Sequence, residues 1–353
     1  MSPAGPGRAD RLTSVLVVNA GSTSLKLSLV DEAGESTALA SLGDAPGDIA
    51  AVGHRVVHGG PAFRAPVLLD DATLTELRAL VDLAPLHNAP ALEAIDATRR
   101  AFPAVPQVAV FDTEFHASMP SEASTAAVPE RWRTHWHIRR YGFHGLSVQW
   151  ASEQVRVRRL VVCHLGGGCS VSAVLEGRSV DTTMGFSPLE GVAMATRSGS
   201  LDPAAILYLL RRGAGSADEL EQVLERESGL LGLSGLSAGV EDLERSPEPA
   251  ARLALDVYCY RIASAIGAMS VALGGLDAIV FSGGVGEGSA LVRARVCGRL
   301  GFLGVELSDE LNASATPDAE IAAPASAVRI VVVRAREDVV AARAVRDVLA
   351  ATP

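Results

Sequence analysis

Two arginines stand in short motifs whose composition suits the binding of an anion. Arg55 lies between two histidines in residues 53–60, which end in a double glycine, and Arg197 lies in the polar residues 195–200. We expect both segments to be loops, from which a planar guanidinium can reach an oxyanion with two donors. Each arginine taken singly is more often part of a surface ion pair. The two motifs therefore indicate an anion-binding site only in combination with other groups.

A carboxylate and a histidine are candidates for the same chemistry. Asp112 follows the apolar residues 108–110, and the carboxyl end of a strand is where α/β proteins place reactive groups. His144 lies in the motif Tyr-Gly-Phe-His-Gly at residues 141–145. A single histidine is more often structural, so His144 becomes a functional candidate only together with other groups.

Three glycine- or serine-rich turns follow strand-like runs. The first, residues 19–24, separates apolar segments at 14–18 and 25–30, and the second, residues 164–170, separates 160–163 from 171–175. Each reads as strand, turn and antiparallel strand. Their similarity favours an internal duplication, with coincidence between two hairpins as the alternative. The third, residues 282–289, follows a strand at 278–281 and precedes a helix at 290–300, a layout in which backbone N–H groups can approach phosphate.

The elements that must position these motifs alternate between helix and strand. We expect helices at 203–212, at 249–273, where the apolar face is wide enough for a buried helix, and at 337–349. Ser216 and Glu219 can form a capping box before another helix that ends near Glu227. A further strand is expected at 328–333. This order of elements predicts α/β domains.

Composition excludes several classes of function. The chain has 353 residues, which suggests two domains, and a net charge of −10 with dispersed arginines, which argues against a nucleic-acid or membrane surface. We expect no membrane span, no signal peptide, no disulfide or zinc spacing among the four cysteines, and a cytoplasmic location. Lys26 is the only lysine. Either it is a remnant of arginine-rich codon usage, or its position requires a compact, flexible ammonium.

Together these segments resemble the acetate kinase family, with its propionate kinase relatives, within the actin-like ATPase superfamily. The resemblance runs in the family's order from near residue 15 to near 343 and includes VLVVNAGSTSLKLSLV, AVGHRVVHGG, LAPLHNAPAL, VAVFDTEFHASMP, RRYGFHGLS, VVCHLGGGCSVSAV, DTTMGFSPLEGVAMATRSGSLDPA, SGLLGLSGLS, AIVFSGGVGEGS and REDVVAARAV. It implies two duplicated actin-like (ribonuclease H-like) α/β domains closing over a cleft. The first would be residues 1–117, joined by the C-terminal helix 337–353, and the second residues 118–336.

The resemblance also implies an activity and its residues. The activity would be reversible, ATP- and Mg²⁺-dependent phosphorylation of acetate, or propionate, to the acyl phosphate by in-line transfer, in a protein that forms a homodimer. The groups around the transferring phosphoryl would be Arg55, Arg197, Asp112 and His144. Arg55 would also contact the substrate, whose apolar pocket would be Val57, Leu86, Phe143 and Pro188.

The remaining implied assignments concern nucleotide and metal. Mg²⁺ would be held by Asn19 and Glu337. The phosphate-facing residues would be Ser22, Ser24 and Lys26 of the first turn, His164, Leu165, Gly166, Gly167 and Gly168 of the second, and Gly283, Gly284, Val285, Gly286, Glu287 and Gly288 of the third.

The sequence departs from the family pattern on the nucleotide side. Gly167 replaces the usual asparagine of the phosphate loop, Gly288 replaces another asparagine, and Gly239 and Glu241 stand where an Asp and an Arg are usual near the adenosine. The segment formed by residues 31–52 is also shorter than in members of the family. Two alternatives therefore stay open: an acyl kinase with another donor, such as pyrophosphate, and a non-catalytic ligand sensor.

Overall fold

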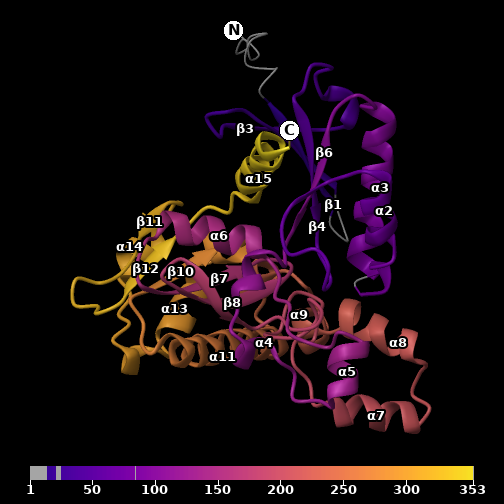
Figure 1. Cartoon of the computed structure of the whole chain (residues 1–353). Coiled ribbons are helices and arrows are strands. Elements are labelled where there is room, and N and C mark those ends of the chain that lie inside the picture. Colours follow the sequence, from indigo (N-terminus) through magenta and orange to yellow (C-terminus); the bar gives the residue numbers. More distant parts are fainter. Residues whose placement is uncertain (1–13, 21–24, 84, 353) are drawn as a thin grey trace. The chain divides into compact units, whose positions relative to one another are not determined.

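The computed structural model describes residues 14–20, 25–83 and 85–352, except for the side chains of residues 82 and 85–87. The chain divides into two compact units (Figure 1). The first takes in the chain up to Ala117, Gly145–Trp150 and the chain from Arg336. The second takes in Ser118–His144 and Ala151–Ala335.

The first unit is built on a six-stranded mixed sheet with the strand order β3-β2-β1-β4-β6-β5. β1 is antiparallel to β2, which is antiparallel to β3, whereas β1, β4 and β6 are mutually parallel and β5 is antiparallel to β6. The central parallel strands are buried on both faces, which explains their near-continuous apolar sequence. The strands are β1 (Val15–Ala20), β2 (Leu25–Val30), β3 (Ser36–Leu39), β4 (Ala51–Val56), β5 (Val67–Leu68) and β6 (Gln107–Phe111).

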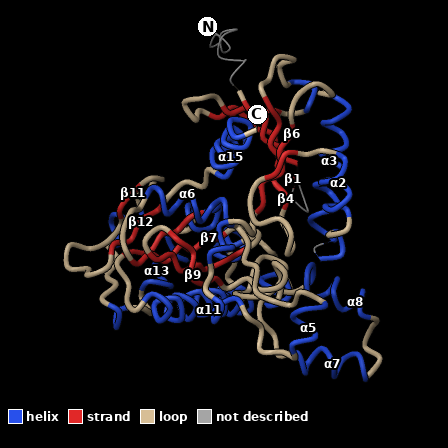
Figure 2. The backbone as a smooth tube through the Cα atoms, viewed as in Figure 1, coloured by secondary structure: helices blue, strands red, loops and turns tan. Residues whose placement is uncertain are grey.

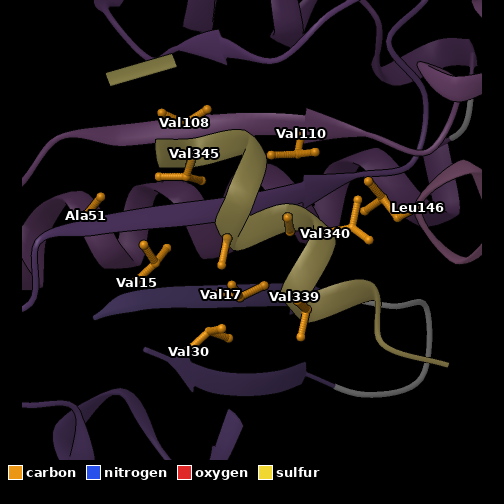
Figure 3. Close-up of a cluster of buried hydrophobic side chains, with 12 residues drawn as sticks. Val15, Val17, Val30, Ala51, Val108, Val110, Leu146, Val339, Val340 and Val345 are labelled. Carbon is orange, nitrogen blue, oxygen red and sulfur yellow. The ribbon is translucent and has the colours of Figure 1, made fainter. Parts of the chain in front are cut away.

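Helices cover both faces of this sheet. The C-terminal helix α15 (Glu337–Ala351) covers one face, where its Val339, Val340 and Val345 meet Val15 and Val17 of β1 (Figure 3). The opposite face packs against α3 (Pro85–Ala101). α15 therefore completes the core of a sheet whose strands come from the first third of the sequence. The other helices of this part are α2 (Asp71–Arg78), the 3₁₀ turns Leu42–Asp44 and Val81–Leu83, and α6 (Gly145–Gln154), which begins in the first unit.

The second unit repeats this topology strand for strand. Its order is β11-β12-β10-β7-β8-β9, and β7, β8, β9, β10, β11 and β12 correspond to β1, β2, β3, β4, β5 and β6 in order and in relative direction. This match is the signature of a duplicated fold. The strands are β7 (Arg159–Leu165), β8 (Cys169–Leu175), β9 (Arg178–Thr182), β10 (Ala278–Ser282), β11 (Ala319–Glu320) and β12 (Arg329–Val332).

The second unit also carries a helical segment between β9 and β10. Its longest helix, α11 (Pro249–Leu273), packs on β7, β8 and β9 (Figure 2). The other helices of the segment are α7 (Pro203–Arg211), α8 (Ala217–Gln222), a π-helix at Val223–Glu227, α9 (Gly229–Ser234) and α10 (Val240–Arg245). Elsewhere in this unit lie α4 (Ser121–Ser124), α5 (Glu130–His135), α12 (Gly283–Gly288), α13 (Ala290–Cys297), α14 (Asp309–Ala313) and the 3₁₀ turn Gly301–Leu303. The 3₁₀ turn Phe115–Ser118 lies where the first unit passes into the second along the chain.

Most expected elements are confirmed, but two segments expected as loops are not, because residues 53–56 belong to β4 and residues 283–288 form a helix. Both strand–turn–strand units are antiparallel hairpins, and the capping box of Ser216 and Glu219 is formed. The glycine-rich residues 283–288, expected as a loop, form the short helix α12, whose first N–H donates to the carboxylate of Glu287 four residues on. All four cysteines are free and buried. Within the described residues, no helix has the length and apolarity that a membrane crossing requires.

Gly53 of β4 allows α15 to approach the sheet closely. A Cβ at this position would lie 2.7 Å from Cγ2 of Val345. We expect Gly53→Ala to lower the free energy of unfolding by about 1–3 kcal/mol, because the overlap is with a stiff β-branched side chain in a packed core. Gly47→Ala is the matched control, since no atom lies within 4 Å of its Cβ position. Equal urea midpoints for the two variants would show that α15 does not pack as described.

Candidate active site

In the first unit, four candidate residues form one connected network around Arg55. Arg55 Nε donates to Asp112 Oδ1 (2.9 Å), and its Nη2 pairs with the other carboxylate oxygen. Arg55 Nη1 donates to Asn19 Oδ1 (3.1 Å), and Asn19 Nδ2 donates to Glu337 Oε2 (3.3 Å). These residues lie on β4, directly after β6, on β1 and at the start of α15. The fold therefore brings together side chains that are far apart in the sequence.

Arg55 does not lie in a loop, as its glycine-flanked motif had suggested. It is the fifth residue of β4, paired in register with Asn19 on β1 and Val110 on β6. Its side chain is 13% exposed, and that of Asp112 is 1% exposed. Burial alone would lower the pKa of Arg55, but the attraction of Asp112 and Glu337 raises that pKa above its usual value. The guanidinium therefore keeps its charge in a largely buried place.

The structure also locates the other candidates of the first unit. Lys26 is exposed on β2, opposite Asn19 in the strand register, and Val57 is buried. Ser22, Ser24 and the side chain of Leu86 lie outside the described residues.

Sequence reasoning missed Asn88, which holds the segment after β4. Its amide oxygen accepts from the backbone N–H of His58, and its amide nitrogen donates to the His58 carbonyl. An asparagine that makes both bonds fixes the backbone of the residue next to Val57. The signal for it was its place in the quoted motif LAPLHNAPAL.

In the second unit, His144 and Arg197 converge on the glycine turn between β7 and β8. A Cβ added to Gly168 would lie 3.0 Å from His144 Nε2 and 3.4 Å from Arg197 Nη1. Nδ1 of His144 hydrogen-bonds the Ser170 hydroxyl (3.0 Å), and its ring lies 4.4 Å from that of His164. The backbone of His144 has a left-handed conformation with φ of 60°, which is uncommon for a histidine and places it directly before α6.

Arg197 lies in a loop, as expected, and is held on two sides. Its Nε pairs with Glu225 Oε2 (2.9 Å), and its Nη1 donates to the carbonyl of Pro188 (3.4 Å). Pro188 and Phe143, the two pocket candidates of this unit, are both buried. Glu225 was not among the expected site residues, because nothing in its polar surroundings in the sequence separates it from other glutamates.

The second and third glycine segments lie side by side. The Cβ position of Gly166 is 4.0 Å from the backbone nitrogen of Gly284, and the backbone of Gly283 approaches the Leu165 carbonyl so closely that a Cβ would lie 2.7 Å from its oxygen. Gly283 has φ of 77°, which glycine adopts without strain. Glu287 accepts from the N–H groups of both Gly283 and Ala335, so this carboxylate fixes the start of α12.

Arg140 is a further residue that sequence reasoning did not single out. Its Nη1 donates to the carbonyls of Thr182, Thr183 and Met184, and its Nη2 pairs with Glu190 (3.0 Å). These bonds tie the segment that leads to His144 to the segment that carries Pro188. The doubled arginine of the motif RRYGFHGLS was the available signal.

The oxygen ligands near Arg55 have the chemistry that Mg²⁺ prefers. Asn19 offers an amide oxygen and Glu337 a carboxylate, both hard ligands. Across the described ranges, no group of three or more His, Cys, Asp and Glu side chains converges as a metal site. A cation here would therefore depend on further ligands from substrate or water.

Comparison with known proteins gives consistent matches along the chain. Residues 40–343 match the Acetokinase family. The chain is 45% identical over 306 residues to a protein named acetate kinase from Cyanothece sp. (strain PCC 7425 / ATCC 29141), covering 84% of this chain and 75% of the relative. A second relative, named acetate kinase from Gloeobacter violaceus (strain ATCC 29082 / PCC 7421), is 46% identical over 310 residues, covering 84% of this chain and 76% of the relative.

Solved structures match the fold over nearly the whole chain. A propionate kinase from Francisella tularensis subsp. tularensis SCHU S4 superposes with a TM-score of 0.86 at 31% identity, covering 94% of this chain and 98% of that one. An acetate kinase from Porphyromonas gingivalis gives a TM-score of 0.83 at 30% identity, covering 96% and 100%. The expected actin-like α/β fold is thereby confirmed.

Because Arg55 is paired with the buried Asp112, replacing Arg55 should destabilise the protein. A position in an exposed loop would have predicted little effect on stability. Arg55→Ala removes the guanidinium from a carboxylate that stays buried, and we expect it to lower the free energy of unfolding by about 2–4 kcal/mol. The double variant Arg55→Ala/Asp112→Ala should regain part of that loss, because the buried charge is removed as well. Urea unfolding measures both. A double variant less stable than Arg55→Ala would contradict the account.

Proposed function

Since the chain belongs to the Acetokinase family, we propose that it transfers the terminal phosphoryl group of ATP to acetate, reversibly, giving acetyl phosphate and ADP. The observation that carries this proposal is the convergence of His144 and Arg197 on Gly168. Because residue 168 is a glycine, a space remains that the His144 imidazole, the Arg197 guanidinium and the backbone all line. Such a set of donors suits the binding of an anionic phosphoryl group during its transfer.

In-line phosphoryl transfer needs positioning and cancellation of charge more than covalent chemistry. In this proposal Arg55 and Arg197 each act on phosphoryl oxygens through a guanidinium that can contact two of them. His144 donates to an equatorial oxygen. An acetate carboxylate is already a nucleophile, so no strong base is required, and Asp112 serves by fixing the orientation and charge of Arg55.

Mg²⁺ would be held by Asn19 and Glu337 together with nucleotide phosphates. Mg²⁺ is commonly bound through one or two carboxylates plus substrate oxygens, so the pair fits. When bound, the ion would neutralise phosphate charge.

The comparisons do not favour pyrophosphate as donor or a sensor without activity, because the relatives that cover most of the chain are named acetate kinases. The departures at Gly239 and Glu241 still bear on the nucleoside. Glu241 pairs with Arg245 on the exposed face of α10 (2.5 Å), so its charge is partly compensated. We propose weak discrimination between adenine and guanine nucleotides, because Gly239 and Glu241 supply neither the same hydrogen-bond acceptor nor a cation that could stack on the base. We also propose that the protein works in the cytoplasm.

The proposed function is tested by one assay of acyl phosphate formation. Acetate, propionate and butyrate are crossed with ATP, GTP and pyrophosphate in the presence of Mg²⁺. We expect product with ATP and GTP, with acetate and propionate as the better acceptors, since each added methylene in a small apolar pocket changes binding by about 1–3 kcal/mol. Product with pyrophosphate alone, or none with any donor, would overturn the proposal.

Gly168 gives a local test of the convergence that carries the proposal. We expect Gly168→Ala to lower kcat at least about tenfold, because the methyl group would displace His144 and Arg197, and small misplacements at a reacting centre are costly. Gly167→Ala is the matched control in the same turn, with no atom within 4 Å of its Cβ position, and should keep near-normal turnover. Similar kcat values for the two variants would remove Gly168 from the site.

We also propose that two copies associate through the helical segment of the second unit. α7 is apolar yet has no buried residue, and Leu207 and Tyr208 on it, with Leu253 and Tyr260 on α11, are each more than half exposed. A depression of about 480 Å³ nearby includes Leu201 among its lining residues. Burial of such surface favours association.

Sedimentation equilibrium tests the association. The protein should sediment as a dimer and Leu207→Glu as a monomer. Leu311→Glu, which changes an exposed leucine on α14, should remain dimeric. A monomeric parent protein, or a dimeric Leu207→Glu variant, would contradict this surface.

A further inference from the structure

We propose that Glu225 is a positioning residue that holds Arg197 in the orientation required for phosphoryl transfer, and that loss of its negative charge sets the acid limit of turnover. The inference rests on the proposed function. It concerns a residue that would touch neither substrate nor nucleotide and would act only through Arg197.

The contact is short and sheltered from water. Oε2 of Glu225 lies 2.9 Å from Nε of Arg197, and the two side chains are 10% and 14% exposed. An ion pair at Nε fixes the orientation of the guanidinium plane and the direction in which its two Nη groups point. A surface pair would contribute little, but a pair shielded to this degree restrains its arginine strongly.

The backbone around both residues is joined as well. The Thr196 hydroxyl donates to the Glu225 carbonyl (2.8 Å), and the Ser198 N–H donates to the Leu224 carbonyl (3.0 Å). Arg197 is therefore flanked on both sides by bonds to the same turn. Glu225 is held to the loop that it restrains through both its side chain and its main chain.

The turn that carries Glu225 has an unusual geometry. Val223–Glu227 is a π-helix that follows α8. π-helical turns are rare in proteins as a whole, and those that occur are often found at functional sites. Just beyond it, Gly229 has φ of 60°, and a Cβ there would lie 2.2 Å from the Met194 carbonyl oxygen and 2.7 Å from that of Arg197. A wide turn followed by a glycine lets the helix approach the loop closely enough for the carboxylate to reach Arg197.

The charges around Glu225 decide the pH dependence. Burial raises the pKa of Glu225, and the neighbouring Glu221 raises it further, whereas Arg197 and Arg226 lower it. The net shift is upward, so the carboxylate takes up a proton at a higher pH than an ordinary glutamate. Turnover should be full above this pKa and should fall as the pH drops through it, because the protonated group no longer holds Arg197 by charge.

The kinetic experiment compares Glu225→Gln with Glu227→Gln, an exposed neighbour on the same turn. At saturating acetate and ATP we expect Glu225→Gln to lower kcat about 10- to 100-fold with KM values changed less than about threefold. The acid limb of its kcat profile should disappear, and Glu225→Asp should recover part of the rate. Glu227→Gln should match the parent protein.

A second variant separates positioning from a general structural effect. In an Arg197→Ala background, Glu225→Gln should have no further effect beyond about twofold, because its route of action is already gone. A full additive loss in that background would overturn the inference. So would a normal kcat for Glu225→Gln alone.

A spectroscopic readout keeps the inference testable even if no kinase activity is found. The Arg197 Nε–H signal, assigned by its loss in Arg197→Ala, should be protected from exchange in the parent protein and in Glu227→Gln but not in Glu225→Gln. Equal protection in both glutamine variants would refute the positioning role, whereas absent acyl phosphate formation alone would refute only the proposed function.

Discussion

The two candidate arginines, one in each unit, depend on the same kind of interaction, a carboxylate held at the guanidinium Nε. Asp112 holds Arg55 and Glu225 holds Arg197, each at 2.9 Å, and all four side chains are largely buried. A cation placed away from water without such a partner would be costly, and one on a flexible side chain would lose orientation. The carboxylate both compensates the buried charge and fixes the orientation of the guanidinium. Much of the local structure places the two carboxylates beside their arginines.

The duplicated topology supplies these carboxylates in different ways. In the first unit Asp112 directly follows β6, so the parallel strands β4 and β6 bring it beside Arg55 without any added element. In the second unit neither Arg197 nor Glu225 lies on a strand. Both belong to the helical segment between β9 and β10, where the π-helix and α9 fix the loop. The repeated sheet is thus a common scaffold, and the segment added to one copy carries what the sheet does not provide.

The sequence was informative where local pattern decides structure and less so where tertiary contacts do. Alternating apolar runs identified both hairpins, and a capping box located α8, because strands and caps are encoded within a few residues. Arg55 was misplaced in a loop because its flanking glycines outweighed the strand pattern, and Gly53 in fact serves close packing of α15. Residues 283–288 were misread since glycine disfavours helix, yet the side chain of Glu287 satisfies the first N–H of α12. Glu225 could not be found, because its role arises from a turn geometry and a partner 28 positions away.

Gly167 carries no side chain, yet its turn keeps a backbone bond to the loop that carries Arg197. The resemblance would place an asparagine there, and the structure leaves room for one, since nothing lies within 4 Å of the Cβ position. The backbone is nonetheless held, because the Gly167 carbonyl accepts from the N–H of Ala195 in the loop that carries Arg197. Backbone N–H groups contact phosphate independently of the side chains they carry. The turn is therefore fixed by its neighbours, so the absent amide should remove one contact to the nucleotide without disturbing the placement of His144 and Arg197.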